Sequence, residues 1–430
     1  MRPPETLAAF ALLDRLYEKA VEAAHPRACL PPHLPAVPDR GRIIVVGAGK
    51  ASAAMAVATE EHYAGLGAAD RIEGAIATRH GFALPTRILR IDEAGHPVPD
   101  EGSRKAAADA LARAASAGPE DLVLVLLSGG ASAIWSAPVI GVDFAEKQAL
   151  TRALLKAGAR ISEINTVRRH ISRIKGGKLA AAAVPARLVT LAISDVPGDL
   201  PEAIGSGPTV ADPTTLADAR AVLERYAITP APGIAAALTC LANETLKPGA
   251  TALDHARYQI VARPQQSLEV AAEAARAAGY EVDLLGDSLE GEARDVARSH
   301  AELAHAAKAA GRRVVILSGG ELTVTVTGQG RGGPNQEYAL ALAIALDGAP
   351  GIHALAGDTD GIDGGGGEAS DPAGARIAPD TLARARAAGI HPADMLANND
   401  STAFFAGLGD LLTPGPTQTN VNDFRAIVVE

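Results

Sequence analysis

The stretch Ile43-Ile-Val-Val-Gly-Ala-Gly-Lys-Ala-Ser52 decides the fold of this chain. It opens with a continuous apolar run, which is typical of a strand that is buried on both faces of a sheet. A glycine turn follows and leads into the alanine-rich segment Ala51–Ala64, which we expect to be a helix. A strand, a glycine turn and a helix N-terminus in this order present backbone N–H groups to an anion. The stretch therefore predicts an α/β protein with anion-binding strand ends.

The alternation of apolar strands and helices continues along the first half of the chain. We expect strands at Arg42–Val46, Gly74–Thr78, Arg87–Asp92, Leu122–Leu127 and Ala186–Ile193, and further helices at Gly102–Ala117 and Phe144–Ala159. Buried strands that alternate with helices predict a parallel sheet covered on both faces. Right-handed crossovers make this a doubly wound, Rossmann-like layer structure.

A chain of 430 residues exceeds the usual size of one hydrophobic core, which favours two domains. Prolines and glycines interrupt the pattern between Tyr226 and Gly249, so we expect an N-terminal Rossmann-like domain at 1–245 and a second α/β domain with a mixed sheet at 246–430. Strands of the second domain are expected at Tyr258–Val261, Glu281–Leu285, Arg313–Leu317, Leu322–Thr327, Gly351–Ala356 and Phe424–Val429. Gly357–Asp371 is a long loop of the kind that is usually functional or mobile.

Composition narrows the classes of partner. The net charge of −10 argues against nucleic acid, because phosphate backbones need a basic protein face. The segment Met1–Glu18 carries charges throughout and predicts an amphipathic helix rather than a signal peptide. The uncharged run Leu122–Val142 is long enough to span a bilayer, but glycines and Pro138 interrupt it. We expect a cytoplasmic protein that acts on small molecules and has no membrane partner, with a homodimer as one option for its assembly.

Lys50 is the first candidate for chemistry, since cations are not favoured at a helix N-terminus. The dinucleotide fingerprint is incomplete, because Ser52 occupies its third glycine position, and Ala51 breaks the P-loop pattern. Arg79 keeps an NADP-binding alternative open. The structural alternative for Lys50 is a solvated lysine at the start of a helix.

Two turns share the sequence Ser-Gly-Gly after apolar strands, at Ser128-Gly129-Gly130 and at Ser318-Gly319-Gly320. Glycine turns at the carboxyl edge of a buried sheet allow close approach of a ligand. Asp195 follows another buried strand, where an α/β enzyme places a metal ligand or a general base, although a capped turn is the alternative.

A run of cations without acids contains Arg168, Arg169, Arg173, Lys175 and Lys178. On a continuous helix, Arg168, Ser172 and Lys175 would share one face. Such runs are commonly solvated, but in an acidic protein this one is the natural binding site for a carboxylate or a phosphate. His170, within the run, is expected to be structural.

The second half carries polar glycine-rich loops. Glu321 follows the second Ser-Gly-Gly turn, and Arg331 is surrounded by glycines, where its planar guanidinium suits phosphate or carboxylate. Asn335 and Glu337 open the next helix. Asp358, Asp360 and Asp363 do not fit an EF-hand, but one or two of them are compatible with magnesium bound together with substrate phosphates. Asn399 lies in a further polar loop.

Together these motifs resemble one family along nearly the whole chain. Gly47-Ala-Gly49-Lys50, Leu127-Ser128-Gly129-Gly130, Asn165-Thr-Val-Arg168-Arg169-His170 and Ser194-Asp195-Val-Pro-Gly-Asp199 are similar to the N-terminal part of the class II glycerate kinases. Leu317-Ser-Gly-Gly-Glu321, Gly330-Arg331-Gly-Gly-Pro-Asn335-Gln-Glu337, Asp358-Thr-Asp-Gly-Ile-Asp363-Gly and Thr417-Gln-Thr-Asn-Val-Asn-Asp423 are similar to that family's MOFRL domain. One departure is the run of four glycines at Gly364–Gly367.

The resemblance implies transfer of the ATP γ-phosphoryl group to the 2-hydroxyl of D-glycerate, with magnesium, in a cleft between the two domains. The family's central lysine and arginine fall on Lys50 and Arg331, and its Ser-Asp-Val aspartate on Asp195. Nucleotide and substrate contacts are expected from Gly47, Gly49, Ser128–Gly130, Arg168, Lys175, Ser318–Gly320, Asn335, Glu337 and Asn399, and metal contacts from Asp195, Glu321 and Asp358. The alternatives are an NAD(P)H-dependent hydroxypyruvate reductase and a non-catalytic two-lobed binder of sugar acids.

Overall fold

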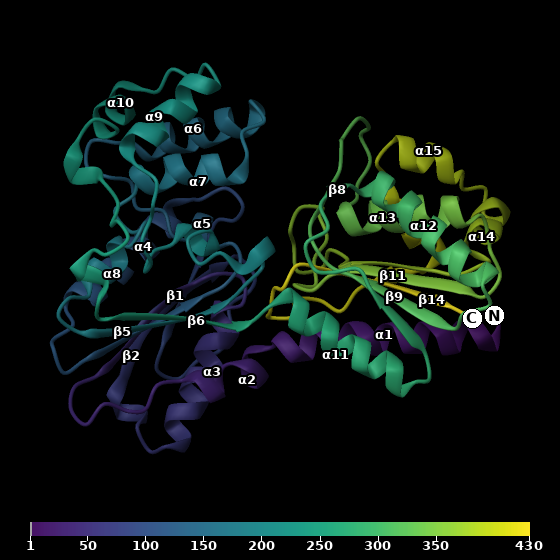
Figure 1. Ribbon diagram of the computed structural model, residues 1–430, viewed down its shortest axis with the longest axis horizontal. Coiled ribbons are helices and arrows are strands. Elements are labelled where there is room, and N and C mark those ends of the chain that lie inside the picture. Colours follow the sequence, from purple (N-terminus) through teal and green to yellow (C-terminus); the bar gives the residue numbers. More distant parts are fainter. Residues whose placement is uncertain (1) are drawn as a thin grey trace. The chain divides into compact units, whose positions relative to one another are not determined.

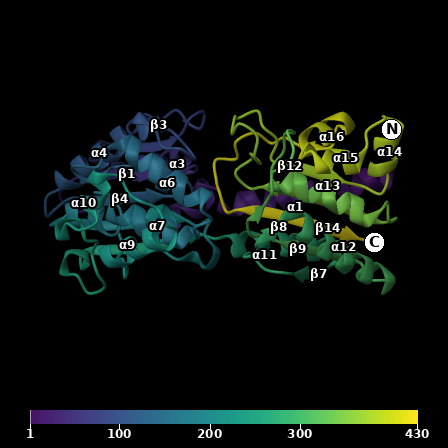
Figure 2. The same ribbon diagram turned by 90° about the horizontal axis from the view of Figure 1, so that it is seen from above.

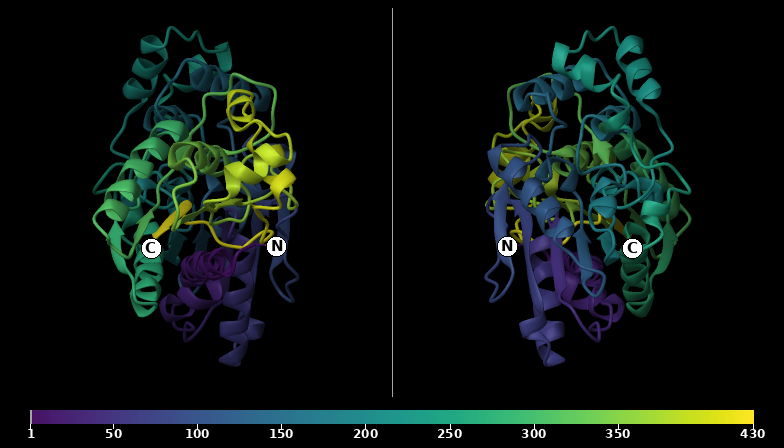
Figure 3. Two further views of the ribbon diagram at one scale, coloured as in Figure 1. Left: turned by 90° about the vertical axis from the view of Figure 1, so that its right-hand side faces the viewer. Right: turned by 90° about the vertical axis from the view of Figure 1, so that its left-hand side faces the viewer.

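The computed structural model describes residues 2–430, which form two compact α/β units (Figure 1). One unit is Cys29–Val261, and the other joins the residues up to Ala28 to Ala262–Glu430. The two chain ends therefore belong to the same unit (Figure 3). These bounds differ from the expected 1–245 and 246–430, because the N-terminal helix packs on the second sheet and the strand near Tyr258 belongs to the first sheet.

The sheet of the unit Cys29–Val261 has six strands in the order β3-β2-β1-β4-β5-β6. The strands are β1 (Ile43–Ala48), β2 (Ile72–Arg79), β3 (Arg90–Ala94), β4 (Leu122–Leu127), β5 (Arg187–Ile193) and β6 (Ala256–Ala262). Neighbouring strands from β3 through β5 run parallel. β1 and β4 are buried along their whole length, as the apolar runs predict. The strand order is that of a doubly wound Rossmann-like sheet, so this prediction is confirmed.

Helices cover both faces of this sheet. The helices of this unit are α3 (Ser52–Gly65), α4 (Glu101–Ala115), α5 (Ala131–Ile134), α6 (Phe144–Lys156), α7 (Ile161–His170), α8 (Lys178–Ala182), α9 (Leu216–Arg225) and α10 (Pro232–Ala237), while the residues of α2 (Pro26–Cys29) are divided between the two units. Small alanines of α4, α5 and α8 pack on one face of β1 and β4. The helices α6, α7, α9 and α10 form a separate helical layer with its own apolar cluster (Figure 1).

The second unit contains a mixed sheet in the order β13-β12-β11-β14-β9-β7. Its strands are β7 (Glu281–Leu284), β9 (Val314–Ser318), β11 (Ile352–Asp358), β12 (Gly374–Ile377), β13 (Leu411–Leu412) and β14 (Asp423–Val429), and a separate pair is β8 (Gly291–Glu292) with β10 (Leu322–Thr323). β14 runs antiparallel to both β9 and β11, whereas β7 and β9 are parallel. The expected mixed sheet is confirmed.

The helices of this unit also lie on both sheet faces. They are α1 (Pro4–Ala24), α11 (Pro264–Ala277), α12 (Ala293–Ala309), α13 (Pro334–Leu346), α14 (Thr381–Ala387), α15 (Pro392–Ala397) and α16 (Ser401–Leu408). α12 and α13 pack side by side on one face (Figure 2). α1 and α11 cover the opposite face, with Leu13, Leu16 and Leu268 in a shared core.

Two expected elements are shorter than the sequence suggested. The strand expected at Leu322–Thr327 contains only Leu322–Thr323, because its partner β8 offers just two residues. The helix expected at Phe144–Ala159 ends at Lys156, and α7 ends at His170. No helix within residues 2–430 combines the length and the apolar character that crossing a membrane requires.

Candidate active site in two sets of residues

Lys50 lies in the turn between β1 and α3, and that turn is tied to the end of β4. The Lys50 backbone N–H donates to the Gly129 carbonyl oxygen at 2.8 Å, and the Ala51 N–H donates to Ser128 Oγ at 3.0 Å. A Cβ on Gly49 would lie 2.1 Å from Ser128 Oγ, so only glycine permits this approach. The turn thus fixes Lys50 beside the Ser128–Gly130 turn.

The backbone donors of this first turn are already used. The Gly49 N–H donates to Ala77 O, and the Ser52 N–H donates to Gly49 O, both at 3.2 Å, in addition to the two bonds of Lys50 and Ala51. The expectation that this turn presents free N–H groups to an anion is therefore wrong. Its glycines serve the close packing of two strand ends.

The Ser128–Gly130 turn keeps its donors. Within residues 2–430, the N–H groups of Gly129 and Gly130 have no acceptor. Gly130 has a φ of +84°, and a Cβ there would lie 3.5 Å from Lys50 Cγ. β1 and β4 are the strands at which the order of the sheet reverses, and ligands of doubly wound folds bind outside the carboxyl ends at this point. Lys50 and two free N–H groups meet there.

Asp195 follows β5, the strand next to β4 in the parallel sheet. Its half-buried side chain lies at the same carboxyl edge as Lys50. The charge of Asp195 adds to the effect of burial in raising the pKa of Tyr258. The fold therefore brings a carboxylate to the edge that carries the lysine.

Arg168 and Lys175 meet at one pocket, although they do not share a helix. α7 ends at His170, so the expected common helical face of Arg168, Ser172 and Lys175 is wrong. The chain turns back after α7, because Ser172 forms a β-bridge with Pro138, and this fold places Arg168 and Lys175 on the same pocket wall. His170 is buried and bonded to Thr166 O and to Glu244 Oε1, each at 2.8 Å, which is a structural role.

Sequence reasoning missed a third cation of this pocket, Lys147 on α6. Its side chain is 5% exposed, and its ammonium donates to Ser136 Oγ at 3.1 Å. Burial, with a smaller contribution from the Arg168 charge, lowers the pKa of Lys147 to about 7. A signal was present, because Lys147 shares the helical register of the buried Leu150 and Leu154, where an apolar residue is expected.

The second set of residues lies at one edge of the mixed sheet. Asp358 at the end of β11 pairs with Asp423 at the start of β14, and Ser318 at the end of β9 pairs with Arg425. This register gathers the Ser318–Gly320 turn, the acidic loop after β11 and the start of α13. The edge therefore combines the C-terminal motifs in one place.

The Ser318–Gly320 turn is held by a buried arginine. Arg425 donates to Gly319 O at 2.7 Å, to Gly320 O at 3.1 Å and to Asp423 Oδ2 at 2.6 Å. The Gly319 N–H is used as well, since it donates to Gly286 O at 2.9 Å. This turn offers fewer free donors than the first Ser-Gly-Gly turn.

Arg331 stands in a loop whose backbone is fixed and whose side chain is 57% exposed. Its N–H donates to Asp400 Oδ1 at 3.2 Å, and its carbonyl accepts from the Thr402 N–H at 2.9 Å. The guanidinium forms an ion pair with Asp371. Arg331 is thus held in place by a carboxylate that an anionic ligand could displace or share.

Asp363 caps the start of α13, where Asn335 lies. Both carboxylate oxygens of Asp363 accept backbone N–H groups, from Asn335 at 3.0 Å and from Gln336 at 2.9 Å. Burial raises the pKa of Asp363 to about 7, and these N–H donors oppose the rise. The Asn335 amide also donates to Asp423 at 2.6 Å, so it bridges two carboxylates inside the protein.

Glu337 and Asn399 are likewise bound within the unit. Glu337 is 1% exposed, pairs with Arg294 and accepts from Asn399 Nδ2 at 3.1 Å. Burial raises the pKa of Glu337. Asn399 Oδ1 accepts from the N–H groups of Thr327 and Gly328. Both side chains hold the loop that carries Arg331, which is a positioning role.

The three carboxylates expected to bind metal do not form a protein-only cluster. No group of three or more His, Cys, Asp or Glu residues within 2–430 is arranged to hold a metal ion. Glu321 is exposed, and Asp358 is half-buried at the sheet edge, where it accepts from the Asp360 N–H at 2.9 Å. Carboxylate oxygens in ones and twos suit magnesium, which commonly completes its shell with water and substrate phosphates.

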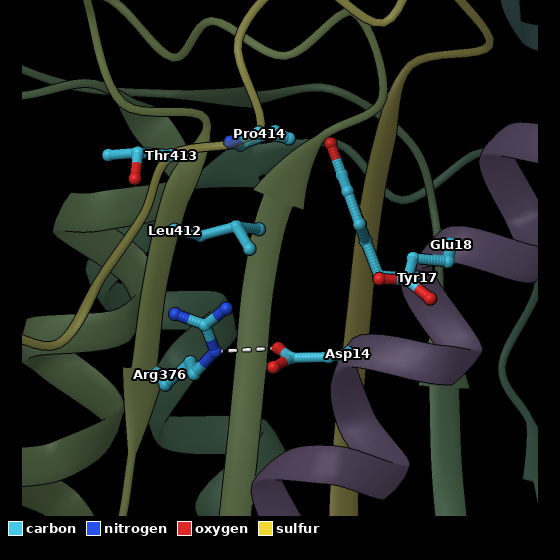
Figure 4. Close-up of a pocket in the computed structure, with 7 residues that line it drawn as sticks. All are labelled: Asp14, Tyr17, Glu18, Arg376, Leu412, Thr413 and Pro414. Carbon is cyan, nitrogen blue, oxygen red and sulfur yellow. Dashed lines mark hydrogen bonds and ion pairs between the residues drawn. The ribbon is translucent and has the colours of Figure 1, made fainter.

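A separate pocket lies between α1 and the strands β12 and β13 (Figure 4). It is lined by Asp14, Tyr17, Glu18, Arg376, Leu412, Thr413 and Pro414. Its arginine is already neutralised, because Arg376 Nε donates to Asp14 Oδ1 at 2.6 Å. Tyr17 donates to Asp358 O at 2.7 Å and so supports the acidic loop from behind. No predicted site residue lines this pocket.

The fold consists of two α/β units, with Lys50 and two open N–H groups at the edge of the Rossmann-like sheet and an acidic set of residues at the edge of the mixed sheet. Family models match residues 12–239 as a domain of unknown function, DUF4147, and residues 314–423 as the MOFRL family. A glycerate kinase structure from Thermotoga maritima matches 99% of this chain and 100% of its own at a TM-score of 0.87 and 37% identity.

The relatives of this chain carry two different names. The D-glycerate 2-kinase of Thermotoga maritima is 38% identical over 98% of both chains. A relative from Agrobacterium vitis, which carries the provisional name hydroxypyruvate reductase, is 50% identical over 97% of this chain and 94% of its own. The chain belongs to the MOFRL-domain glycerate kinase family, and this confirms the resemblance found in the sequence.

Proposed function

We propose that this protein is an ATP-dependent D-glycerate 2-kinase that produces 2-phosphoglycerate and ADP. The observation that carries the proposal is the switch point of the parallel sheet. Lys50 is fixed there beside the free N–H groups of Gly129 and Gly130. A lysine and two backbone donors at a sheet edge suit a phosphoryl group, because phosphoryl transfer needs positioning and charge neutralisation more than covalent chemistry.

The catalytic roles follow from chemical type. Lys50 and Arg331 are assigned to the charge on the transferring phosphoryl group. Asp195 is assigned one of two roles: it accepts the proton of the acid's 2-hydroxyl as the hydroxyl oxygen attacks phosphorus, or it helps to hold magnesium. Ser128–Gly130 and Ser318–Gly320 are assigned to nucleotide or substrate contacts, as are Gly47 and Gly49 through the shape of their turn. Glu337 and Asn399 act by holding the Arg331 loop, and Asn335 acts by bridging Asp363 and Asp423.

Magnesium, when bound with the nucleotide, would neutralise charge on the phosphate oxygens. Asp358, Asp195 and Glu321 are the carboxylates proposed to hold it, each together with phosphate oxygens. This assignment suits the chain because its carboxylates do not form a closed protein cage within residues 2–430. Deprotonation of the 2-hydroxyl and orientation of the acid remain tasks of the protein's own side chains.

The hydroxypyruvate reductase alternative is less well supported. A dinucleotide pyrophosphate needs free N–H groups at the first strand-to-helix turn. Here the N–H groups of Gly49, Lys50, Ala51 and Ser52 all have acceptors in the protein. Arg79 at the end of β2 is 8% exposed and its guanidinium carbon lies 4.6 Å from the centre of the Phe82 ring, so it is not presented to a 2′-phosphate.

A pair of assays on the same preparation separates the two activities. ADP release is followed with ATP, magnesium and D-glycerate, and NADH or NADPH oxidation is followed with hydroxypyruvate. We expect ADP release that requires glycerate and no oxidation of reduced nicotinamide. Oxidation without ADP release would overturn the proposal.

A further inference from the structure

Lys147, Arg168 and Lys175 face one small pocket that contains no carboxylate. The pocket is lined by Pro99, Ser132, Ala133, Ser136, Lys147, Gln148, Thr151, Arg168 and Lys175. Neither lysine forms an ion pair within residues 2–430, and Arg168 forms no ion pair or side-chain hydrogen bond there. Three cations therefore converge without a counter-ion from the described chain.

The three cations are not equally satisfied. The Lys175 ammonium donates to Ser132 O at 2.9 Å, to Ser132 Oγ at 3.2 Å and to Gly205 O at 3.2 Å, which uses its three protons. Among residues 2–430, Lys147 donates only to Ser136 Oγ, so two of its protons have no acceptor there. Lys147 and Arg168 are thus the groups left to bind an external anion.

Burying these cations opposes folding. A buried charge without a partner is costly, and like charges nearby add to the cost. This cost is visible in the pKa values of the two lysines. Burial, together with the charge of Arg168, lowers the pKa of Lys147 to about 7. Burial, together with the charges of Lys147 and Arg168, lowers the pKa of Lys175 well below its usual range. Lys147 in its charged form is therefore expected to destabilise the folded protein, so stability does not explain its presence in the pocket.

The small volume of the pocket limits the size of the anionic group that can enter it. The cavity measures ≈ 20 Å³. By the same measure about 10–15 Å³ holds one water, so the space suits one small group such as a carboxylate and not a triphosphate. Ser136 and Gln148 add polar atoms to the wall, while Pro99 and Ala133 keep it narrow.

The pocket adjoins the proposed phosphoryl site. Its lining residues Ser132 and Ala133 belong to α5, which begins directly after the Ser128–Gly130 turn. A Cβ on Gly130 would lie 3.0 Å from the His96 ring, and His96 is three residues from Pro99 of the pocket wall. The pocket wall and the Ser128–Gly130 turn are therefore built from adjoining residues of one segment.

We propose that Lys147 and Arg168, supported by Lys175, form the pocket that recognises the carboxylate of the hydroxy-acid substrate, with Lys147 as its specificity-determining cation. The proposal rests on the proposed kinase function and names the subsite of its acceptor substrate. Lys147 takes up a proton as the carboxylate binds, so binding and protonation are linked. The charges facing Lys147 in this process are those of Arg168 from α7 and Lys175 from the segment after it.

The test compares K147M with K156M, a substitution at an exposed lysine of the same helix. Methionine keeps most of the length of the side chain and removes the charge. We expect K147M to raise the KM for D-glycerate at least 10-fold, with kcat within about threefold and the KM for ATP unchanged. Loss of one buried charge-assisted contact is of this order. K156M should match the wild type.

Two further readouts separate a binding role from a structural one. The wild-type KM for D-glycerate should rise between pH 7 and pH 9 as Lys147 loses its proton, and K147M should lack this component of the rise. Calorimetry should show K147M to melt at or above the wild-type temperature at pH 7, because an unpaired buried charge has been removed.

The outcomes distinguish this proposal from the kinase proposal. If the wild type shows no glycerate-dependent ADP release, the proposed function fails, whatever the variants do. If the wild type is active but K147M keeps the wild-type KM for glycerate, the carboxylate pocket is overturned and the kinase stands. A K147M variant that instead raises the KM for ATP would assign the pocket to the nucleotide and would also overturn the proposal.

Discussion

The same three residues, Ser-Gly-Gly, end a buried strand in each unit, and the two turns are used differently. At Ser128–Gly130 the serine hydroxyl accepts a neighbouring N–H, and two glycine N–H groups stay open. At Ser318–Gly320 the Gly319 N–H is bonded, and Arg425 binds both glycine carbonyls. The first turn therefore keeps two backbone donors open, while the second turn is held by Arg425.

The contrast extends to the charges around each turn. The first turn adjoins a pocket with three cations and no carboxylate. The second lies among Asp358, Asp363 and Asp423, and its exposed arginine, Arg331, is already paired with Asp371. Identical glycine turns therefore acquire their function from flanking side chains. The edge beside the first turn has the charge to bind an anionic substrate. The edge beside the second turn combines an arginine with carboxylates, which is a set of groups that suits phosphate together with a metal cation.

Removing the brace should have the largest effect. R425M leaves Asp423 buried without its partner and frees the carbonyls of Gly319 and Gly320, which should destabilise the C-terminal unit by about 3–5 kcal/mol. Calorimetry measures the loss, and hydrogen exchange of the Leu317–Glu321 peptide should accelerate. R313M, at an exposed arginine, serves as the control. Equal stability of the two variants would show that the second turn is not braced.

Removing the lysine at the open turn should act on catalysis. K50A should lower kcat about 100-fold or more, because it removes a group assigned to charge that develops in the transition state. R331A is expected to have an effect of the same order. Steady-state kinetics with ATP and D-glycerate give the values, and K105A on the exposed face of α4 is the control. A kcat near that of the wild type would refute the assignment of Lys50.

The serines of the two turns offer a matched pair. S128A removes the acceptor of the buried Ala51 N–H, which should cost about 1–3 kcal/mol in the N-terminal unit. The Ser318 hydroxyl makes no side-chain hydrogen bond within the described residues 2–430, so S318A should cost less. Thermal unfolding of both variants measures the difference. Equal losses would contradict the comparison of the turns.

The smallest effect concerns the pH dependence of stability near the open turn. The pKa of Lys147 is about 7 in the folded protein and near 10.5 when unfolded. Between these values the unfolded state binds a proton that the folded state lacks, so stability rises with pH through this window. The difference between the melting temperature of the wild type and that of K147M should therefore shift in favour of the wild type from pH 7 to pH 10. Parallel curves would show that Lys147 is not buried as a weak base.

The inner strands of the parallel sheet were predictable from the sequence. The sheets to which β6 and the N-terminal helix belong were not. β4 matches its expected bounds because Leu122–Leu127 is uninterrupted and buried on both faces. β6 was expected in the second domain, since a short strand such as Tyr258–Val261 carries no signal for the sheet that it joins. The N-terminal helix was expected as amphipathic, but its apolar face does not state which sheet it covers.

The site was predictable in its residues more than in their roles. Lys50 and Ser128–Gly130 do lie together, because neighbouring parallel strands end at one edge. The use of the N–H groups at Gly49–Ser52 could not be predicted, since it depends on the position of Ser128 across the sheet. Lys147 looked like an ordinary helix lysine, and only its place in the buried register of α6 marked it.

Phosphorus NMR of the product is the most direct test of phosphoryl transfer to the 2-hydroxyl of D-glycerate. The wild-type protein is incubated with ATP, magnesium and D-glycerate, and the phosphorylated product is identified by its coupling to the carbon-bound protons. We expect 2-phosphoglycerate, formed in equal amount with ADP. A 3-phosphoglycerate product would contradict the assignment of the 2-hydroxyl as the acceptor, and the absence of any phosphorylated glycerate would contradict phosphoryl transfer itself.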